Sequence, residues 1–265
     1  MPAGPQIATL LYHEVTDDPA STGFQWTGAL SCTHTRAAFT RHLAEIATSP
    51  VAPELVGDID LTRPGRHLLL TFDDGGRSTL HAGDELKRRG WKGHFFVVTE
   101  QIGSRYFVNA REIRYLRSCG HIIGSHSHTH PSLFREQSPE RMLDEWRVSC
   151  DVLAQLLGEP CTTASVPGGD MSRRVLQSAN TAGLRYLFTS DPWLTPRKEG
   201  DCWILGRFST KVGTPPRRVH ELAHFRGWTR VWMVRQLKVL ASRSLPGLYR
   251  LYVRSRYRER PAVVD

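Results

Sequence analysis

The sequence predicts an α/β fold built around a parallel sheet. Two observations carry this prediction: short apolar runs alternate with segments of helical periodicity, and glycines stand where the helical segments end. A length of 265 residues with 40% hydrophobic and 23% charged residues is typical of a folded chain with a large core, and excludes a disordered one. About six or seven strand–helix units fit into roughly 210 residues, which suits a (β/α) barrel and an open doubly wound sheet equally well.

The alternation begins at residue 7 and continues to about residue 190. Strands are predicted over residues 7–12, 67–72, 93–98, 121–126, 163–168 and 185–190. Helices are predicted over residues 35–47, 78–90, 109–120, 138–158 and 173–183. The glycines expected at helix ends are Gly90, Gly120, Gly158 and Gly183.

A domain boundary is predicted at Thr214–Arg218, where the sequence TPPRR ends the alternation. Residues 214–265 contain 12 Lys or Arg and 3 Asp or Glu, so this segment carries the whole net charge of +9 and the remaining 23 basic and 23 acidic residues cancel. We therefore expect a catalytic domain over residues 1–213 and a basic helical C-terminal extension over residues 214–265.

Other sequence features narrow the class of protein. No run reaches the roughly 18 apolar residues of a membrane span, and the N-terminus lacks the basic and apolar regions of a secretory signal. The five cysteines are scattered and form no CxxC pair, which indicates neither a disulfide framework nor a cysteine-rich zinc site. These features predict a cytoplasmic protein with reduced thiols. Nucleic-acid binding is not indicated, because no reading motif accompanies the basic charge.

Adjacent carboxylates, Asp73 and Asp74, follow an apolar strand in the sequence HLLLTFDDGG. Neighbouring carboxylates resist ionising together unless a cation or a proton offsets their repulsion. A solvated strand-to-turn junction would also contain Asp and Gly, for backbone reasons alone. The loops after parallel strands gather at one face of the sheet, so this pair is expected to open onto the same cleft as the other post-strand loops.

A second post-strand loop, GSHSHTH, presents His126, His128 and His130 within five residues. His126 and His130 are four residues apart, so a helical turn or tight loop can direct both imidazoles at one ion, and a carboxylate from the first loop completes a three-ligand site. In this interpretation one Asp binds the metal and its neighbour acts as a base. A chance polar loop is the alternative. An iron(II) oxygenase triad has the same donors, but the β/α alternation contradicts its usual jelly-roll fold.

The TFDDG and GSHSHTH motifs together resemble the polysaccharide deacetylase (NodB-homology) superfamily, also called carbohydrate esterase family four. The resemblance extends from Leu10 to about Leu187. It implies a deformed (β/α)7 TIM-like barrel that binds a divalent metal, most often zinc and sometimes cobalt or nickel. It also implies that Asp73 is the general base and that Asp74, His126 and His130 are the metal ligands.

Three further motifs match the family less well. The loop ASVPGGD corresponds to an oxyanion-binding segment, with Gly168, Gly169 and Asp170 as candidates, although a plain turn has the same composition. Relatives often place an arginine before that proline to hold the base. Ser165 and Val166 stand there in this sequence, so the residue that holds Asp73 is not identified. The sequence SDPW places Asp191 and Trp193 where relatives have groove-wall residues. His224 in ELAHF matches the general-acid motif in letters but lies in a helical stretch, and His13 is expected to be buried.

The predicted function is metal-dependent removal of N-acetyl groups from an amino sugar in a polysaccharide, lipid-linked or small glycosylated substrate. The alternatives are hydrolysis of a non-carbohydrate amide and a non-catalytic carbohydrate-binding protein; an intact Asp73 favours an enzyme.

In the C-terminal extension, the segment LPGLYRLYVRSRYRER has helical spacing. This spacing places Leu248, Leu251 and Tyr252 on one face and Arg250, Arg254 and Arg258 on another. This helix is expected either to dock on the barrel or to contact an anionic membrane, which would place the protein peripherally at the inner membrane face.

Overall fold

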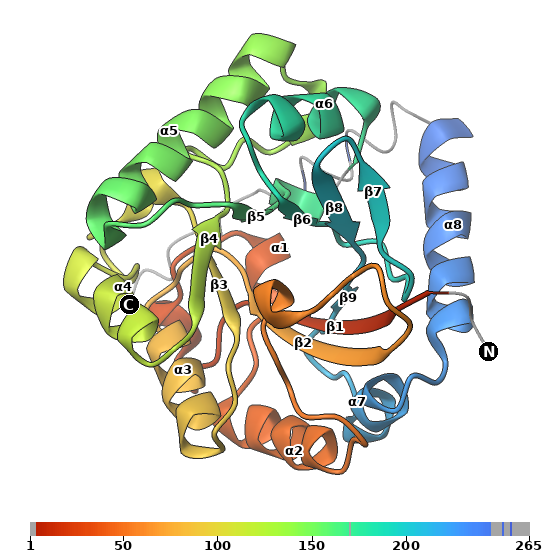
Figure 1. Ribbon diagram of the computed structural model, residues 1–265. Helices are drawn as coiled ribbons and strands as arrows, with labels where there is room; N and C mark the ends of the chain where they lie inside the picture. Colours follow the sequence, from red (N-terminus) through yellow and green to blue (C-terminus); the bar gives the residue numbers. More distant parts are fainter. Residues whose placement is uncertain (1–3, 170, 245–250, 252–254, 256–265) are drawn as a thin grey trace.

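The computed structural model describes residues 4–169, 171–244, 251 and 255, and one curled sheet forms its centre (Figure 1). The strand order in this sheet is β7-β8-β6-β5-β4-β3-β2-β1-β9. The strands are β1 (Gln6–Tyr12), β2 (Arg66–Phe72), β3 (His94–Val97), β4 (Ile122–Ser125), β5 (Thr163–Ser165), β6 (Tyr186–Phe188), β7 (Arg197–Glu199), β8 (Cys202–Leu205) and β9 (Phe208–Ser209).

The helices are α1 (Thr27–Leu30), α2 (Arg36–Ala47), α3 (Thr79–Arg88), α4 (Ala110–Ser118), α5 (Pro139–Leu157), α6 (Arg173–Thr181), α7 (Pro216–Ala223) and α8 (Trp228–Ser244). The helices from α2 to α8 surround the sheet on its outer side, and the short helix α1 lies near the centre of the view (Figure 1). Local sequence sets their ends: α4 begins with a capping box formed by Asn109 and Glu112. α5 begins after Ser138, whose side chain accepts the Arg141 amide, and ends at Gly158 with a φ of 72°.

All six predicted strands and all five predicted helices are present, with ends shifted by a few residues. The short helix α1 and the strands β7, β8 and β9 were not predicted. These unpredicted strands matter because β8 and β9 are parts of one continuous segment, separated only by Gly206 and Arg207.

This segment joins the two sides of the sheet. β8 pairs with β6 in parallel, and β9 pairs with β1 in parallel through Leu10 and Phe208. The strands from β1 to β6 follow one another without a reversal of order, whereas a doubly wound sheet reverses at a switch point. Counting β8 and β9 as one, seven parallel strands form the deformed barrel, which confirms the predicted fold class; β7 is an antiparallel addition.

Apolar side chains fill the barrel and cover its outer face. Ile7, Leu69, Phe96, Phe188 and Leu205 belong to one buried cluster and come from five different strands. The intervening strand residues, such as Leu10, Leu68 and Leu70, join a second cluster with helices α2, α3 and α4. Along each strand the side chains alternate between these two clusters. Polar residues stand at the carboxyl ends of β2 and β4, which is where sites form in such barrels.

The beginning of the C-terminal extension packs against the barrel. Val219 and Leu222 of α7 lie in the same buried cluster as α2, and the Trp228 Nε1 group at the start of α8 donates to the Leu222 carbonyl at 3.0 Å. The boundary at Thr214 stays a prediction. Within the residues that the structure describes, no helix has the length and hydropathy required to cross a membrane.

Candidate active site

Asp73 and Asp74 follow β2, and the His126–His130 loop follows β4, so the two motifs meet at the carboxyl ends of neighbouring strands. Both carboxylates are buried. Three residues of these loops have left-handed backbones: Asp74 with a φ of 75°, Ser127 with 64° and His130 with 55°. Such conformations are unfavourable for residues other than glycine and cluster at functional sites.

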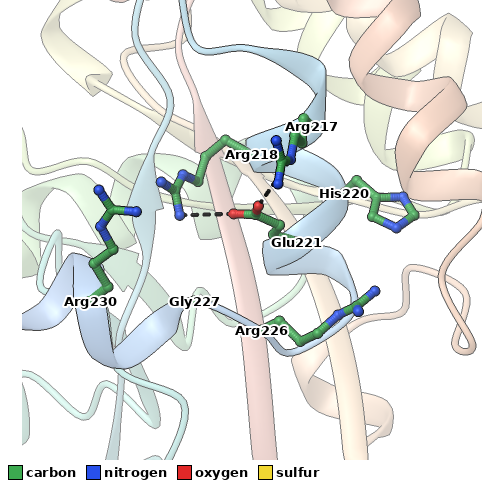
Figure 2. A pocket seen from close by; sticks show the side chains of 7 residues that line it. All are labelled: Arg217, Arg218, His220, Glu221, Arg226, Gly227 and Arg230. Atoms are coloured by element: carbon green, nitrogen blue, oxygen red, sulfur yellow. Dashed lines mark ion pairs between the residues drawn. The ribbon is translucent and has the colours of Figure 1, made fainter.

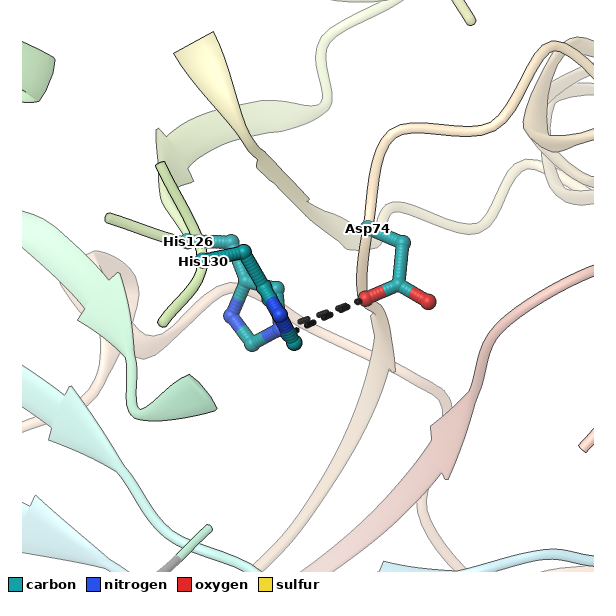
Figure 3. A group of neighbouring side chains, drawn as sticks. All are labelled: Asp74, His126 and His130. Carbon is teal, nitrogen blue, oxygen red and sulfur yellow. Dashed lines mark ion pairs between the residues drawn. The ribbon is translucent and has the colours of Figure 1, made fainter. Parts of the chain in front are cut away.

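Asp74, His126 and His130 form a compact group of potential metal ligands (Figure 3). The Asp74 Oδ1 atom lies 3.3 Å from His126 Nε2 and 3.8 Å from His130 Nε2. One ligand atom from each residue lies within 4.8 Å of the other two. Two imidazole nitrogens and one carboxylate oxygen at this spacing suit a divalent cation with coordination positions open to a substrate.

Ser165, the last residue of β5, determines which nitrogen of His126 faces this group. His126 Nδ1 lies 3.1 Å from the Ser165 carbonyl oxygen, which is only an acceptor, so Nδ1 carries the proton. Nε2 is then the nitrogen directed at Asp74, as in metal-binding histidines. The Ser165 Oγ atom lies 2.6 Å from the same Nδ1 and donates to Asp73 Oδ1 at 3.1 Å.

Arg207, between β8 and β9, holds Asp73 through a buried bidentate ion pair. Arg207 Nη1 donates to Asp73 Oδ1 at 2.7 Å and Nη2 donates to Oδ2 at 2.9 Å. Burial alone would raise the pKa of Asp73, but the positive charges of Arg207 and His126 outweigh it and hold the pKa below its ordinary value. Asp73 is therefore kept ionised and in one orientation.

The two oxygens of Asp73 have different surroundings. Oδ1 accepts from both Arg207 and Ser165, whereas Oδ2 accepts from Arg207 and lies 3.8 Å from His126 Nε2. Each carboxylate oxygen has two lone pairs. Among the described contacts, Oδ2 is therefore the oxygen with spare accepting capacity, and it faces the candidate metal site.

Arg207 is thus the residue that holds Asp73, which the sequence alone did not identify. Ser165, which stands near the expected arginine position, contributes a second hydrogen bond to Asp73. The signal in the sequence was the run CWILGRFST, in which one arginine interrupts apolar residues. The Arg207 side chain is completely buried, and its Nε donates to the Thr189 carbonyl at 2.8 Å.

Glu145 of α5 shapes the histidine loop and was also missed in the sequence. Its Oε2 atom accepts the backbone N–H groups of His128 at 2.8 Å and Thr129 at 2.7 Å. Its Oε1 atom accepts the Thr129 hydroxyl at 2.6 Å. The His128 ring pairs with the Thr99 hydroxyl at 3.0 Å and is not part of the metal-ligand group.

The candidate oxyanion loop forms a short turn, Pro167–Gly169, after β5. The Gly169 N–H donates to the Val166 carbonyl at 2.8 Å, so this amide is already used inside the turn. Gly168 is exposed, with a φ of 65°. Asp170 lies outside the described residues, so Gly168 is the remaining described candidate for an oxyanion donor.

The candidate groove-wall residues make contacts within the chain. Asp191 Oδ1 accepts from Arg235 Nε of α8 at 2.8 Å. The Arg197 guanidinium lies 4.3 Å from the centre of the Trp193 ring. The Asp191 carboxylate and the Trp193 ring thus have protein partners, and a substrate-binding role for either remains a prediction.

Of the two further histidines, His13 is near the acidic pair and His224 is distant from it. Burial lowers the pKa of His13, and the charges of Asp74 and Asp73 oppose this shift. His224 caps the end of α7, and the next residue, Phe225, lies under the guanidinium of Arg66 at 5.4 Å. Arg66 begins β2 and the acidic pair follows its last residue, about 20 Å further along the strand.

Removing the Arg207 charge is expected to destabilise the fold. We expect Arg207→Met to lower the free energy of unfolding by about 3–5 kcal/mol, because Asp73 becomes a buried carboxylate without its partner. Adding Asp73→Asn should recover part of this loss. Urea unfolding of wild type, both single variants and the double variant in EDTA measures the coupling; strictly additive effects would contradict a direct interaction.

Comparisons with known proteins point to one family and one fold. Residues 60–187 match the family model for polysaccharide deacetylase. The peptidoglycan-N-acetylglucosamine deacetylase PgdA of Listeria monocytogenes is 28% identical over 158 residues, which cover 57% of this chain and 33% of that protein. The chain thus spans about a third of the length of this curated relative.

Solved structures show the same fold. IcaB from Ammonifex degensii superposes with a TM-score of 0.68 at 21% identity, covering 83% of this chain and 98% of that one. A polysaccharide deacetylase from Bacillus cereus gives a TM-score of 0.70 at 16% identity, covering 83% and 69%. The family-model match over residues 60–187, which contains both paired motifs, assigns this part of the chain to the polysaccharide deacetylase (NodB-homology) superfamily.

Proposed function

We propose that the chain is a metal-dependent hydrolase that removes N-acetyl groups from an amino sugar in a polysaccharide, lipid-linked or small glycosylated substrate. The observation that carries this proposal is the combination of a three-ligand group with a separate carboxylate, Asp73, that Arg207 keeps ionised beside it. The family and the printed activity of the relative PgdA support an acetylated amino sugar as the substrate class.

The donor set indicates how a metal would bind. Asp74 Oδ1, His126 Nε2 and His130 Nε2 would hold one divalent ion, with zinc preferred and cobalt or nickel as alternatives. When bound, this ion would supply Lewis acidity toward an acetamide carbonyl and an attacking water. The Ser165 carbonyl contributes by fixing the His126 tautomer that leaves Nε2 available.

Asp73 carries the proton transfers in this proposal. Its Oδ2 atom accepts a proton from the attacking water, while Arg207 and Ser165 hold the carboxylate in place. The leaving amine must then gain a proton, and His224 is too distant to supply it. Since Arg207 lowers the pKa of Asp73, a protonated Asp73 is a strong acid and returns its proton to the nitrogen. Water is consumed, and acetate and a free amine are produced.

Two other functions fit the fold: hydrolysis of a non-carbohydrate amide, and carbohydrate binding without turnover. A protein that only binds sugar has no use for a buried carboxylate kept ionised beside the candidate metal site. This favours an enzyme, and the activity assay separates the remaining alternatives.

The test is acetate release by zinc-loaded protein. We expect acetate from at least one of chitin oligosaccharides, peptidoglycan glycan strands, a lipid-linked N-acetylamino sugar or a small N-acetyl glycoside, and none from acetyl-lysine peptides. Release only from the peptides would instead show a non-carbohydrate amidase. Sugar binding without acetate from any substrate would show a binding protein.

A further inference from the structure

Helix α8 lies at the outer edge of the molecule (Figure 1). Apolar side chains stand on two opposite faces of this helix. Its inner face is anchored by buried Trp228, by Val231 against the main core and by the Arg235–Asp191 ion pair. A surface helix usually has a polar outer face. In α8 the face opposite the anchored one is also apolar, so it exposes apolar side chains to water.

The outer face of α8 exposes large apolar side chains. Met233 is 50% exposed, Val234 49%, Leu237 67% and Leu240 58%. Met233, Leu237 and Leu240 are three or four residues apart and therefore lie on one side of the helix. Among the described residues, five of the nine large apolar side chains that are exposed belong to α8, and such a concentration is typical of an interaction site.

A pocket lined by arginines adjoins the start of the same helix (Figure 2). Its volume is about 470 Å³, and its lining residues are Arg217, Arg218, His220, Glu221, Arg226, Gly227 and Arg230. Glu221 forms ion pairs with Arg218 at 3.0 Å and with Arg217 at 3.4 Å. Among the described residues, Arg226 and Arg230 have no carboxylate partner within ion-pair distance. The pocket therefore has an excess of positive charge.

We propose that α8 and this arginine pocket bind the surface of an anionic phospholipid membrane. Met233, Leu237 and Leu240 insert into the interface, and the arginines of the pocket bind lipid phosphates.

Charge complementarity favours lipid over a second copy of the chain. Residues 214–265 carry a net charge of +9, so two copies meeting through α8 would bring like charges together, whereas an anionic bilayer neutralises them. Of the six residues named in the predicted terminal helix, Leu251 is described and is 62% exposed; Leu248, Tyr252, Arg250, Arg254 and Arg258 lie outside the described residues.

The test is co-sedimentation of the full chain with vesicles. We expect binding to vesicles of phosphatidylglycerol and phosphatidylcholine, no binding to phosphatidylcholine alone, and weaker binding at about 500 mM than at about 50 mM salt. Leu237→Glu should reduce binding about tenfold or more. Arg226→Gln with Arg230→Gln should reduce it on the order of twentyfold, since each cation near the surface contributes about fivefold.

Matched substitutions elsewhere separate this surface from general effects. Val212→Glu changes an exposed apolar residue outside α8, and Arg105→Gln with Arg147→Gln removes two exposed arginines from other elements. Both controls should bind like wild type. Binding by Leu237→Glu equal to wild type, or no binding by wild type at low salt, would overturn the proposal. A wild-type dimer that Leu237→Glu dissociates would assign the face to a second copy instead.

Discussion

Replacing Asp73 by Asn is expected to reduce acetate release by a factor of about 10² to 10⁴ while leaving the metal in place. The amide has the size of the carboxylate but cannot accept a proton from water. Asp73 is not one of the three grouped ligands, so Asp74, His126 and His130 remain as they are. The prediction therefore separates two neighbouring aspartates by their roles.

The measurement combines kcat for acetate release with zinc content per chain. Asp144→Asn, which changes an exposed residue of α5, is the control and should leave both quantities unchanged. Because Asp73→Asn leaves Arg207 buried without its carboxylate partner, the fold must be checked by urea unfolding in the same experiment. A folded, zinc-loaded Asp73→Asn protein with the wild-type rate would exclude Asp73 as the base.

The candidate site was predictable where its chemistry lies in short contiguous motifs. Asp73 with Asp74, and His126 with His130, each occupy a few residues directly after a strand. A parallel sheet brings the ends of its strands to one face, so the meeting of these motifs follows from the alternation of strands and helices. The structure places Asp74, His126 and His130 together as expected.

The supporting residues were not predictable in the same way. Arg207 contacts Asp73 from a position 134 residues later in the chain, and a charged residue inside an apolar run indicates a strand end rather than a buried partner. Glu145 stands in the middle of a helix, where a glutamate usually faces water. Only the tertiary packing shows that both are buried and what they bind.

The arrangement around Asp73 also explains how a chain can keep two adjacent carboxylates ionised in its interior. Arg207 neutralises Asp73, and His126 and His130 lie beside Asp74, so each member of the pair has its own partner. Burial raises the pKa of Asp74, yet the interactions with His126, His13 and His130 lower it well below its ordinary value. These separate partners support the proposed roles, with Asp73 as the proton acceptor and Asp74 as a metal ligand.

Replacing His126 or His130 by Ala is expected to remove the bound metal, and with it the activity. Each substitution deletes one of the three donor atoms that lie within 4.8 Å of one another. Metal content should fall from about one ion per chain to near zero after dialysis. At a zinc concentration 100 times the Kd, wild type should gain about 2.7 kcal/mol of unfolding free energy from the ion, and neither variant should gain it.

His128→Ala is the matched control for these variants, because it removes a histidine of the same loop whose ring pairs with Thr99 outside the ligand group. Its protein should keep both the zinc and the zinc-dependent stabilisation. Inductively coupled plasma mass spectrometry and urea unfolding with and without zinc measure the two quantities independently of activity. If His128→Ala loses zinc while His126→Ala or His130→Ala retains it, the assigned ligand set is wrong, and the role of Asp73 must be reconsidered with it.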